Sequence, residues 1–498
     1  MALARVYSRA QTGIEAPEVM VEAHLANGLP SLTLVGLPET AVKESKDRVR
    51  SALLTSGFEF PARRITLNLA PADLPKEGGR FDLAIALGIL AASGQIPVEA
   101  LNHLECLGEL ALSGAVRPIQ GVLPAALAAR AAGRTLLVPQ VNAEEASLAT
   151  GLQVLAVTHL TQVTAHLQGQ SPLAPYQAQG LQTQRNSYPD LSEVQGQLSA
   201  RRALLVAAAG AHNLLFSGPP GTGKTLLASR LPGLLPPLTE QEALEVAAIQ
   251  SIAHSEPLQH WPQRPFRQPH HSASGPALVG GGSRPQPGEI SLAHQGVLFL
   301  DELPEFDRKV LEVLREPLES GEIVIARARN RTRFPARFQL VAAMNPCPCG
   351  YLGDPSGRCR CTQEQIQRYR NRLSGPLLDR IDLHLTMARE TTRLNLAPAD
   401  QPSSAQVAQQ VAQARCLQIQ RQGVANAFLD LEGLRQHCTL IAEDQHWLEQ
   451  ACERLKLSLR AAHRLLKVAR TLADLEGVDQ IARRHLAEAL QYRPTLGL

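Results

Sequence analysis

The stretch NLLFSGPPGTGKTLLASRL, residues 213–231, constrains the fold more than any other part of the chain. An apolar run leads into a glycine-rich loop, and a second apolar run with helical spacing follows. Glycines let backbone N–H groups curl around phosphate oxygens, and the N-terminus of the next helix adds a partial positive charge. In such a loop Lys224 contacts the β- and γ-phosphates, and Thr225 binds Mg²⁺. The predicted phosphate loop comprises Gly218, Pro219, Pro220, Gly221, Thr222, Gly223, Lys224 and Thr225.

The surrounding region, from Leu191 to about Thr386, alternates apolar strands with helices, which predicts a parallel α/β sheet. One predicted strand lies in the segment GVLFLDE. Residues 297–300 form a buried run, and Asp301 and Glu302 follow it directly. Open α/β sheets bind ligands at the carboxyl ends of their strands. We therefore expect Asp301 to hold Mg²⁺ through water and Glu302 to orient the attacking water. The alternative is an acidic pair that merely ends a strand at the surface.

Two further polar residues of the same region are candidate site residues. FQLVAAMNP closes on Asn345, which can bond the γ-phosphate or the attacking water, although a polar residue at a strand end is common. SGPLLDRIDLHL contains Arg380, and spacing alone does not separate a catalytic arginine from a surface arginine that caps a helix.

The order of the motifs GPPGTGKT, FLDE, AMNP, LLDRIDL and SLRAAHRLLKVARTLADL resembles that of AAA+ ATPases, and within them the magnesium-chelatase-like branch. The resemblance covers essentially the whole chain. It implies ATP and Mg²⁺ as cofactors and a homo-hexameric ring. It also implies that Arg380 is an arginine finger that reaches the ATP of the neighbouring subunit and stabilises transition-state charge. Arg460 would be the second sensor in the helical lid, with Arg464 as its competitor.

The predicted fold class is α/β: an AAA+ phosphate-loop core with a helical lid, preceded by an α+β domain. Composition and pattern divide the chain into an amino-terminal region (1–168), a polar linker rich in Gln, Pro and Ser (169–190), an α/β region (191–390) and a helical region (391–498). The resemblance implies that the third region is the ATPase core and the fourth its helical lid.

The first region resembles the proteolytic domain of Lon and the terminal domain of RadA, a ribosomal-protein-like fold. The stretches that carry this are PADLPKEGGRFDLAIALGIL and LGELALSGAVRPIQGVLPAALAARAAG. The positions of Lon's nucleophilic serine and its activating lysine read Arg80 and Leu123 here. Acyl transfer then has no attacking group, so the resemblance implies the fold and not the peptidase. Arg63, Arg64, Lys76 and Arg80 predict a basic surface that serves DNA; the alternative is a rigid collar that helps the ring assemble.

The stretch IARARNRTRF, residues 325–334, places an arginine at every second position, and no acidic residue lies between Ile323 and Leu340. A strand repeats every two residues, so these side chains share one face. Arginine binds phosphates with a planar fork of donors, and the family carries a pore hairpin at this place in the chain. The row predicts a hairpin that tracks a DNA backbone, whereas a charged edge strand is the alternative. Its arginines are Arg327, Arg329, Arg331 and Arg333.

A second candidate pore loop is LVGGGSRPQPGE, residues 278–289, in which Arg284 would contact DNA. Glycine and proline mark any turn, so this loop carries the weaker prediction. The nearby FRQPHH contains His270 and His271, which could face the nucleotide, a metal or a core hydrogen-bonding partner. Because no acid or cysteine stands at ligand spacing, the structural interpretation is favoured.

The segment CPCGYLGDPSGRCRC holds two tight cysteine pairs separated by a loop rich in glycine and proline. Four thiolates so arranged can close a tetrahedral site, although C-x-C is tighter than the usual C-x-x-C. The alternative is four free thiols beside the nucleotide site. We expect a structural zinc held by Cys347, Cys349, Cys359 and Cys361.

Composition limits where such a protein works. The net charge is only +3, so nucleic-acid contacts must come from local patches. The start of the sequence lacks the apolar core of a signal peptide and no run is long enough for a membrane span, which predicts a cytoplasmic protein without membrane contact.

The residues and the resemblance together predict an ATP-driven ring-shaped DNA motor, a helicase that promotes branch migration during natural transformation and recombination. Its expected partners are single-stranded, double-stranded and branched DNA, with recombinase or competence proteins. One rival is a magnesium-chelatase-type motor subunit that remodels a protein partner. A second rival, an ATP-dependent protease, conflicts with the missing serine and lysine.

Overall fold

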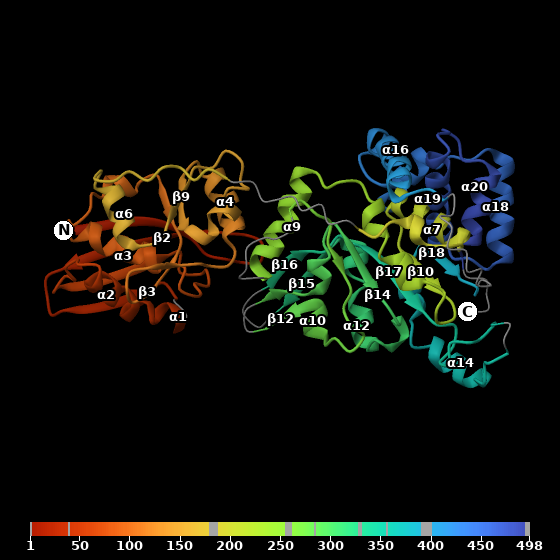
Figure 1. Cartoon of the computed structure of the whole chain (residues 1–498), viewed down its shortest axis with the longest axis horizontal. Coiled ribbons are helices and arrows are strands. Elements are labelled where there is room, and N and C mark those ends of the chain that lie inside the picture. Colours follow the sequence, from red (N-terminus) through yellow and green to blue (C-terminus); the bar gives the residue numbers. More distant parts are fainter. Residues whose placement is uncertain are drawn as a thin grey trace.

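The computed structural model describes residues 2–37, 40–178, 188–253, 261–282, 285–326, 331–354, 357–389 and 401–493. Three parts follow one another along its long axis (Figure 1). The amino-terminal domain lies at one end, the phosphate-loop core in the middle and the helical lid at the other end. Within the described residues, no helix is long and apolar enough to cross a membrane.

The amino-terminal domain is built on a seven-stranded mixed sheet with strand order β3-β4-β2-β1-β5-β8-β9. Neighbours β1, β2 and β4 are antiparallel, and the remaining pairs are parallel. Along β2 every second residue is buried, because alternate side chains of a strand face opposite sides. The strands are β1 (Ala2–Arg9), β2 (Glu18–Ala26), β3 (Ser31–Val35), β4 (Arg64–Ala70), β5 (Leu104–Cys106), β8 (Thr135–Pro139) and β9 (Val154–Val157), with a small pair β6 (Glu109–Leu110) and β7 (Val116–Arg117).

Helix α3, DLAIALGILAA, is apolar on all sides and every one of its residues is buried, packed on β1 and β2. A helix that is hydrophobic all round belongs in a core, and α3 fills that place here. The mixed α+β character agrees with the predicted Lon-like fold. The helices of this domain are α1 (Thr40–Lys43), α2 (Ser45–Thr55), α3 (Asp82–Ala92), α4 (Val122–Ala131), α5 (Ala143–Ala146) and α6 (Leu160–Leu167).

The core is a five-stranded sheet in which all pairs are parallel, with strand order β11-β14-β17-β10-β18. Strands β10, β14 and β17 are buried throughout, as expected for a sheet covered on both faces. The parallel α/β prediction is therefore confirmed. The strands are β10 (Leu214–Ser217), β11 (Phe266–Arg267), β14 (Val297–Leu300), β17 (Gln339–Met344) and β18 (Leu383–Thr386).

Helices and two small antiparallel pairs surround this sheet. The pair β15 and β16 forms a hairpin between β14 and β17, on the side of the core that faces the amino-terminal domain (Figure 1). The helices are α7 (Leu198–Gly210), α8 (Lys224–Ala228), α9 (Glu240–Ala253), α10 (Gly275–Val279), α11 (Glu289–Leu292), α12 (Arg308–Val313), α13 (Pro317–Ser320), α14 (Gln363–Arg370) and α15 (Gly375–Leu378). The pairs are β12 (Gly280–Gly281) with β13 (Gln286–Pro287), and β15 (Glu322–Ala326) with β16 (Arg331–Pro335).

The lid is entirely helical in its described part, as the sequence predicted. Its helices α16 and α19 pack on α7, so the apolar residues of lid and core form one continuous cluster. The lid helices are α16 (Ser404–Gln422), α17 (Leu431–His437), α18 (Ala442–Arg454), α19 (Leu459–Leu475) and α20 (Arg483–Gln491).

The amino-terminal domain contacts the core at two places. Leu123 of α4 packs on Leu244 and Ala247 of α9, and the Gly121 N–H donates to the Ser251 carbonyl at 2.9 Å. The turn at Gly13 meets strand β16: a Cβ at Gly13 would lie 2.8 Å from Thr332 Cγ2, so only glycine fits. The base of the hairpin therefore rests against the amino-terminal domain.

Candidate nucleotide-binding site

Three strands of the core sheet end at the same edge and carry the predicted site residues. The phosphate loop follows β10, Asp301 and Glu302 follow β14, and Asn345 follows β17. These strands are parallel neighbours, so their carboxyl ends lie side by side. The sheet thus brings together residues that are more than 100 positions apart in the sequence.

Lys224 and Thr225 begin helix α8 directly after the loop. Lys224 Nζ donates to the carbonyls of Gly218 and Pro219 at 2.7 and 2.9 Å, and lies 3.3 Å from Asn345 Oδ1. Burial lowers the pKa of Lys224, while the charges of the nearby carboxylates oppose that shift. The ammonium group therefore stands inside the loop, where a phosphate would replace its carbonyl partners.

Thr225 Oγ1 donates to Asp301 Oδ2 at 2.6 Å. A hydroxyl and a carboxylate in contact at the mouth of a phosphate loop are the oxygen ligands that Mg²⁺ takes beside nucleotide phosphates. The residues present thus fit Mg²⁺ with ATP. When bound, the ion would neutralise charge on the β- and γ-phosphates.

Glu302 is held by a residue that the sequence did not assign. Its Oε2 lies 3.1 Å from His271 Nδ1, and the His271 ring stands 4.2 Å from that of His270. Glu302 also has a left-handed backbone (φ +52), which is uncommon for a residue with a side chain. The sequence favoured a structural role for the histidine pair; His271 is only partly buried and has Glu302 as its partner, so its role stays a prediction. Adjacent strands β11 and β14 create the contact, and no spacing in the sequence signals it.

Arg380 follows α15 and is buried, with 6% of its surface exposed. Its guanidinium donates to the carbonyls of Pro376 and Arg315 at 2.6 and 3.2 Å, and its Nη2 lies 2.5 Å from Glu319 Oε1. In the single chain this arginine is therefore engaged by its own subunit and not extended into solvent.

The two candidate second sensors differ in their surroundings. Arg464 Nη1 donates to Asp382 Oδ1 at 2.8 Å, which ties lid helix α19 to the segment before β18. Arg460, one turn earlier on α19, is exposed, and no partner is found for it among the described residues. The structure therefore gives Arg464 an ion-pair partner, whereas Arg460 is exposed and its assignment as second sensor stays a prediction.

The four cysteines of the cluster lie together. All four Sγ atoms are within 4.8 Å of one another, and Cys347 Sγ lies 3.4 Å from that of Cys349 and 3.8 Å from that of Cys359. A tetrahedron with Zn–S bonds of about 2.3 Å has edges of about 3.8 Å, so the group could hold a metal ion. A Cβ on Gly350, within the cluster, would lie 2.9 Å from Pro220 Cδ, so the cluster packs on the phosphate loop.

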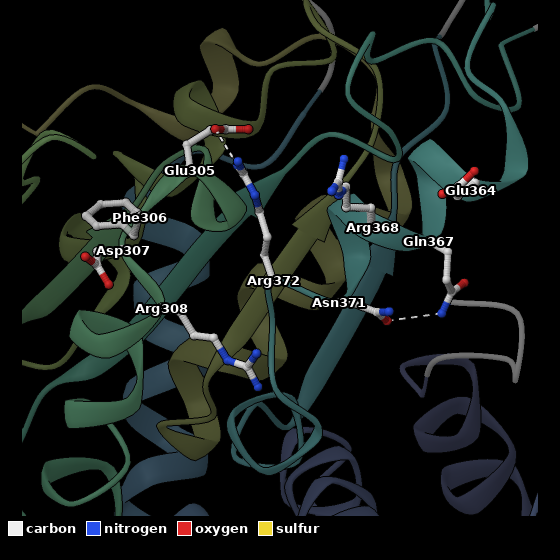
Figure 2. Close-up of a pocket in the computed structure, with 9 residues that line it drawn as sticks. All are labelled: Glu305, Phe306, Asp307, Arg308, Glu364, Gln367, Arg368, Asn371 and Arg372. Carbon is white, nitrogen blue, oxygen red and sulfur yellow. Dashed lines mark hydrogen bonds and ion pairs between the residues drawn. The ribbon is translucent and has the colours of Figure 1, made fainter.

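An open pocket of about 580 Å³ lies just beyond the catalytic edge, between the segment after Glu302 and helix α14 (Figure 2). Arg372 spans it and contacts Glu305 at 2.7 Å, while Gln367 donates to Asn371 at 3.1 Å. Acidic and basic side chains both line the pocket, so its wall favours neither sign of ligand charge. The ion pair between Arg372 and Glu305 links the segment after α14 to the segment after Glu302.

The predicted hairpin is present, with β15 and β16 paired from Glu322–Pro335 to Ala326–Arg331. Along β16 the exposed and buried residues alternate, so Arg331 and Arg333 share the outer face while Thr332 and Phe334 face inward. Arg333 is 3.7 Å from Glu322, but 74% of its side chain is exposed, and such a pair is weak. Arg327, Arg329 and Arg284 lie outside the described residues.

Two residues of the predicted basic surface are not at the surface. Lys76 is fully buried and Arg80 is 6% exposed, whereas Arg63 and Arg64 are exposed. The packing of the segment before α3 against the rest of the domain covers both side chains. The expectation of a four-residue basic surface is therefore wrong for Lys76 and Arg80.

Family models match most of the chain. Residues 190–394 match "Magnesium chelatase, subunit ChlI", residues 21–142 match "Subunit ChlI of Mg-chelatase", and residues 401–493 match "Magnesium chelatase, subunit ChlI C-terminal". The Competence protein ComM of Haemophilus influenzae is 54% identical over 506 residues, which cover 100% of this chain and 99% of that protein. The chain belongs to the magnesium-chelatase-like AAA+ ATPase family.

Other family members and one more distant protein are also similar. The YifB protein of Escherichia coli is 53% identical over 501 residues, which cover 99% of this chain and 97% of that protein. Lon protease 2 of Bacillus subtilis is 28% identical over 163 residues, covering 29% of each chain. Family membership implies ATP and Mg²⁺ as cofactors, in agreement with the loop geometry described above.

Proposed function

We propose that this protein is an ATP-driven, ring-shaped DNA motor that promotes branch migration of recombination intermediates. The proposal rests on one observation, which is that the core carries two features together. One is the set of nucleotide-site residues at the carboxyl edge of its sheet (the nucleotide edge), and the other is a hairpin with exposed arginines. The family supplies the ATPase class, and the relative named Competence protein ComM supports a role in competence.

The hydrolysis step uses the residues at the carboxyl edge of the sheet. Lys224 binds the terminal phosphates, Thr225 and Asp301 hold Mg²⁺, and Asn345 contacts the γ-phosphate or the attacking water. Glu302 orients that water once its side chain leaves His271. Arg460 senses the nucleotide from the lid.

Arg380 acts in this proposal on the neighbouring subunit, and sheet topology supports the assignment. Strands β10 and β18 are parallel, with Ser217 opposite Thr386. The phosphate loop follows the carboxyl end of β10, whereas Arg380 precedes the amino end of β18. The two are thus separated by at least the length of the strands, about 13 Å for four residues, which is beyond the reach of the side chain. A ring, here a hexamer, brings Arg380 to another subunit's ATP.

DNA is the proposed track because of the hairpin. Arg331 and Arg333 stand on one exposed face, and no acidic residue follows them before Leu340. Together with Arg327, Arg329 and Arg284, they would contact phosphates without reading bases. A chelatase-type motor acting on a protein partner is the second candidate, because the family models carry that name. It gives no reason for a row of arginines.

We further propose that the cysteine cluster holds one structural zinc ion. A zinc ion there would fix the loop between Asn345 and α14, and through Gly350 it would support the phosphate loop.

The test is unwinding of a three-strand junction by the purified full-length protein with ATP and Mg²⁺. We expect ATP-dependent strand displacement and an ATPase rate that rises with DNA. Glu302→Gln is the matched control, since it binds the same DNA and nucleotide. An ATPase that responds to no DNA, single-stranded, double-stranded or branched, would refute the motor and favour the chelatase-type alternative.

A further inference from the structure

A second cavity, of about 250 Å³, lies between the amino-terminal domain and the core. Residues just before α3 form one wall, the turn at Thr12 forms another, and Thr332 of the hairpin and Gln286 of the β12–β13 pair close it from the core side. The cavity is separate from the nucleotide edge. None of its lining residues belongs to the phosphate loop or to the segments directly after β14 and β17.

Two buried polar atoms of residues that line this cavity have no hydrogen-bond partner among the residues that the structure describes. They are Arg80 Nη1 and Thr12 Oγ1. Arg80 is 94% buried, and its Nη2 donates to the Gln120 carbonyl at 2.5 Å. Burial lowers the pKa of Arg80 to about 10, with the charge of Glu77 opposing the shift, so the side chain remains a cation at neutral pH. A buried guanidinium with an unused N–H is costly, and proteins normally supply its acceptor.

The backbone adds further donors at the same place. Gly79 and Arg80 come just before Phe81, the residue that precedes the 11-residue helix α3. The first N–H groups of the helix itself, those of Asp82 and Leu83, already donate to the carbonyls of Gly79 and Gly108. Within the described part of the chain, neither the Gly79 N–H nor the Arg80 N–H has a hydrogen-bond acceptor. The first-turn acid Asp82 does not satisfy them, because it accepts from Arg48 and from the Leu110 N–H.

Two carboxylates, Glu77 and Glu109, also line the cavity, and Arg80 forms an ion pair with neither of them. Glu109 lies against Gly79, but it pairs with Arg117 at 3.5 Å. Among the described residues no carboxylate oxygen lies within ion-pair distance of Arg80. A guanidinium, a hydroxyl and unpaired backbone N–H groups are all hydrogen-bond donors toward an oxyanion, and such groups bind phosphate and carboxylate elsewhere.

We propose that this cavity is an oxyanion-binding site, which takes a phosphate-type group through the side chains of Arg80 and Thr12 and the backbone N–H groups of Gly79 and Arg80. The bound group would also lie beside Thr332, so it would join the amino-terminal domain to the strand that carries Arg331 and Arg333. The phosphate comes either from DNA passing the hairpin or from a free small anion. The site goes beyond the proposed motor function and does not depend on it.

The first measurement uses inorganic phosphate and the full-length protein. A non-hydrolysable ATP analogue with Mg²⁺ fills the nucleotide site, and chloride at matched ionic strength is the reference. We expect phosphate to raise Tm in a saturable way, since a ligand that binds only the folded state stabilises it. A Tm that follows ionic strength alone, with no excess effect of phosphate over chloride, overturns the proposal.

Variants locate the effect. Arg80→Met removes the guanidinium, and Thr12→Val removes only a hydroxyl from a side chain of the same shape. Arg63→Met, an exposed arginine of the same domain, is the control. We expect Arg63→Met to match the wild type, Arg80→Met to lose the phosphate effect, and Thr12→Val to bind phosphate about tenfold more weakly, as for removal of one hydrogen bond to a charged group. If Arg80→Met fails to fold, Thr12→Val decides. Equal phosphate response in Thr12→Val and wild type refutes the site.

DNA binding then identifies the source of the phosphate. If DNA supplies it, Thr12→Val weakens DNA binding, and inorganic phosphate competes with DNA for the wild type more strongly than for Thr12→Val. If a free anion supplies it, the two proteins bind DNA equally while the thermal difference remains. Either result supports the site, because the thermal measurement contains no DNA. The thermal measurement can therefore refute the anion site while the motor proposal stands, and the motor proposal can fail while the anion site stands.

Discussion

Arg380 Nη2 lies 2.5 Å from Glu319 Oε1 within the same chain. The arginine that would complete a neighbour's active site is therefore held by a carboxylate that is itself half exposed. In the proposed ring, assembly would exchange this partner for the neighbour's phosphate. Because Glu319 is half exposed and solvent screens the pair, we take its contribution as up to about 1 kcal/mol, which is enough to lower the fraction of free Arg380 about fivefold.

Glu319→Gln should therefore raise the ATPase rate of the assembled protein, by up to about fivefold. Glu316→Gln, on an exposed glutamate of the same segment, is the control and should leave the rate unchanged. Steady-state ATPase at several protein concentrations measures both. A rate that falls in Glu319→Gln would mean that the pair positions Arg380 for catalysis and does not restrain it.

Arg380→Ala and Lys224→Ala subunits should complement each other. Each protein alone is inactive, but a mixed interface can pair an intact phosphate loop with an intact Arg380 from the next subunit. ATPase assays across mixing ratios check this. Absence of any recovered activity in rings shown to contain both subunits would argue against action across the interface.

Lys224→Ala should abolish nucleotide binding, whereas Glu302→Gln should retain ATP and slow its hydrolysis by about 100-fold or more. The difference arises because Lys224 contacts phosphate while Glu302 acts only on the water. Equilibrium binding of a fluorescent ATP analogue and single-turnover hydrolysis separate the two effects. Wild-type hydrolysis by Glu302→Gln would remove the role assigned to that carboxylate.

Local sequence patterns were sufficient to predict which residues lie together at the nucleotide edge of the core sheet. The phosphate loop, Asp301 and Asn345 each follow an apolar strand, and parallel strands bring their carboxyl ends to one edge whatever the rest of the chain does. The clustering of the four cysteines could be predicted from the sequence for a similar reason, because they lie within 15 residues of one another. Family resemblance added the lid and the Lon-like domain.

Contacts between distant segments could not be read in the same way. His271 meets Glu302 only because β11 pairs with β14, and Arg464 meets Asp382 only because the lid closes on the end of the core. The burial of Arg80 depends on how the segment before α3 packs. A charge in a polar, glycine-rich stretch predicts exposure, and here tertiary structure overrides it.

Cys359→Ser should lose the metal. Purified, reduced wild-type protein should contain about one zinc per chain, and the variant should contain none and should melt at a lower temperature. Cys416→Ser is the matched control, because Cys416 is exposed on α16 and far in sequence from the cluster. Elemental analysis and thermal unfolding check both. Wild-type protein that is fully reduced and free of zinc would exclude the site.

His384 should make the protein less stable as the solution is acidified. Burial, followed by the charge of Arg493, lowers the pKa of His384 from 6.5 to about 4. The unfolded chain then takes up the proton first, so stability is full above pH 6.5, falls as the pH drops toward 4, and stops falling below 4. The loss is roughly 3 kcal/mol. The free energy of unfolding, measured with denaturant, should depend more steeply on pH between 6.5 and 4 in the wild type than in His384→Gln. The exposed His103→Gln should follow the wild type.

The hairpin should bind DNA through phosphates and not bases. Arg331→Ala with Arg333→Ala removes two cations from the exposed face of β16 without touching the inward-facing Thr332 and Phe334. We expect weaker binding to all DNA sequences alike. The log–log salt slope should fall by about 0.7 to 0.9 for each arginine that no longer neutralises a phosphate. Basal ATPase should survive, because the nucleotide edge is a separate surface, while DNA stimulation and strand displacement fall.

The control for the hairpin variant is Arg435→Ala with Arg454→Ala, two exposed arginines of the lid. It removes the same net charge from another face, so a general charge effect would change both proteins equally. A charged edge strand that only discourages aggregation predicts unchanged DNA affinity and at most a small loss of stability. Affinity at several salt concentrations separates these views. If the hairpin variant keeps both the affinity and the salt slope of the wild type, DNA contact must be sought in the loop at residues 278–289 or in the amino-terminal domain.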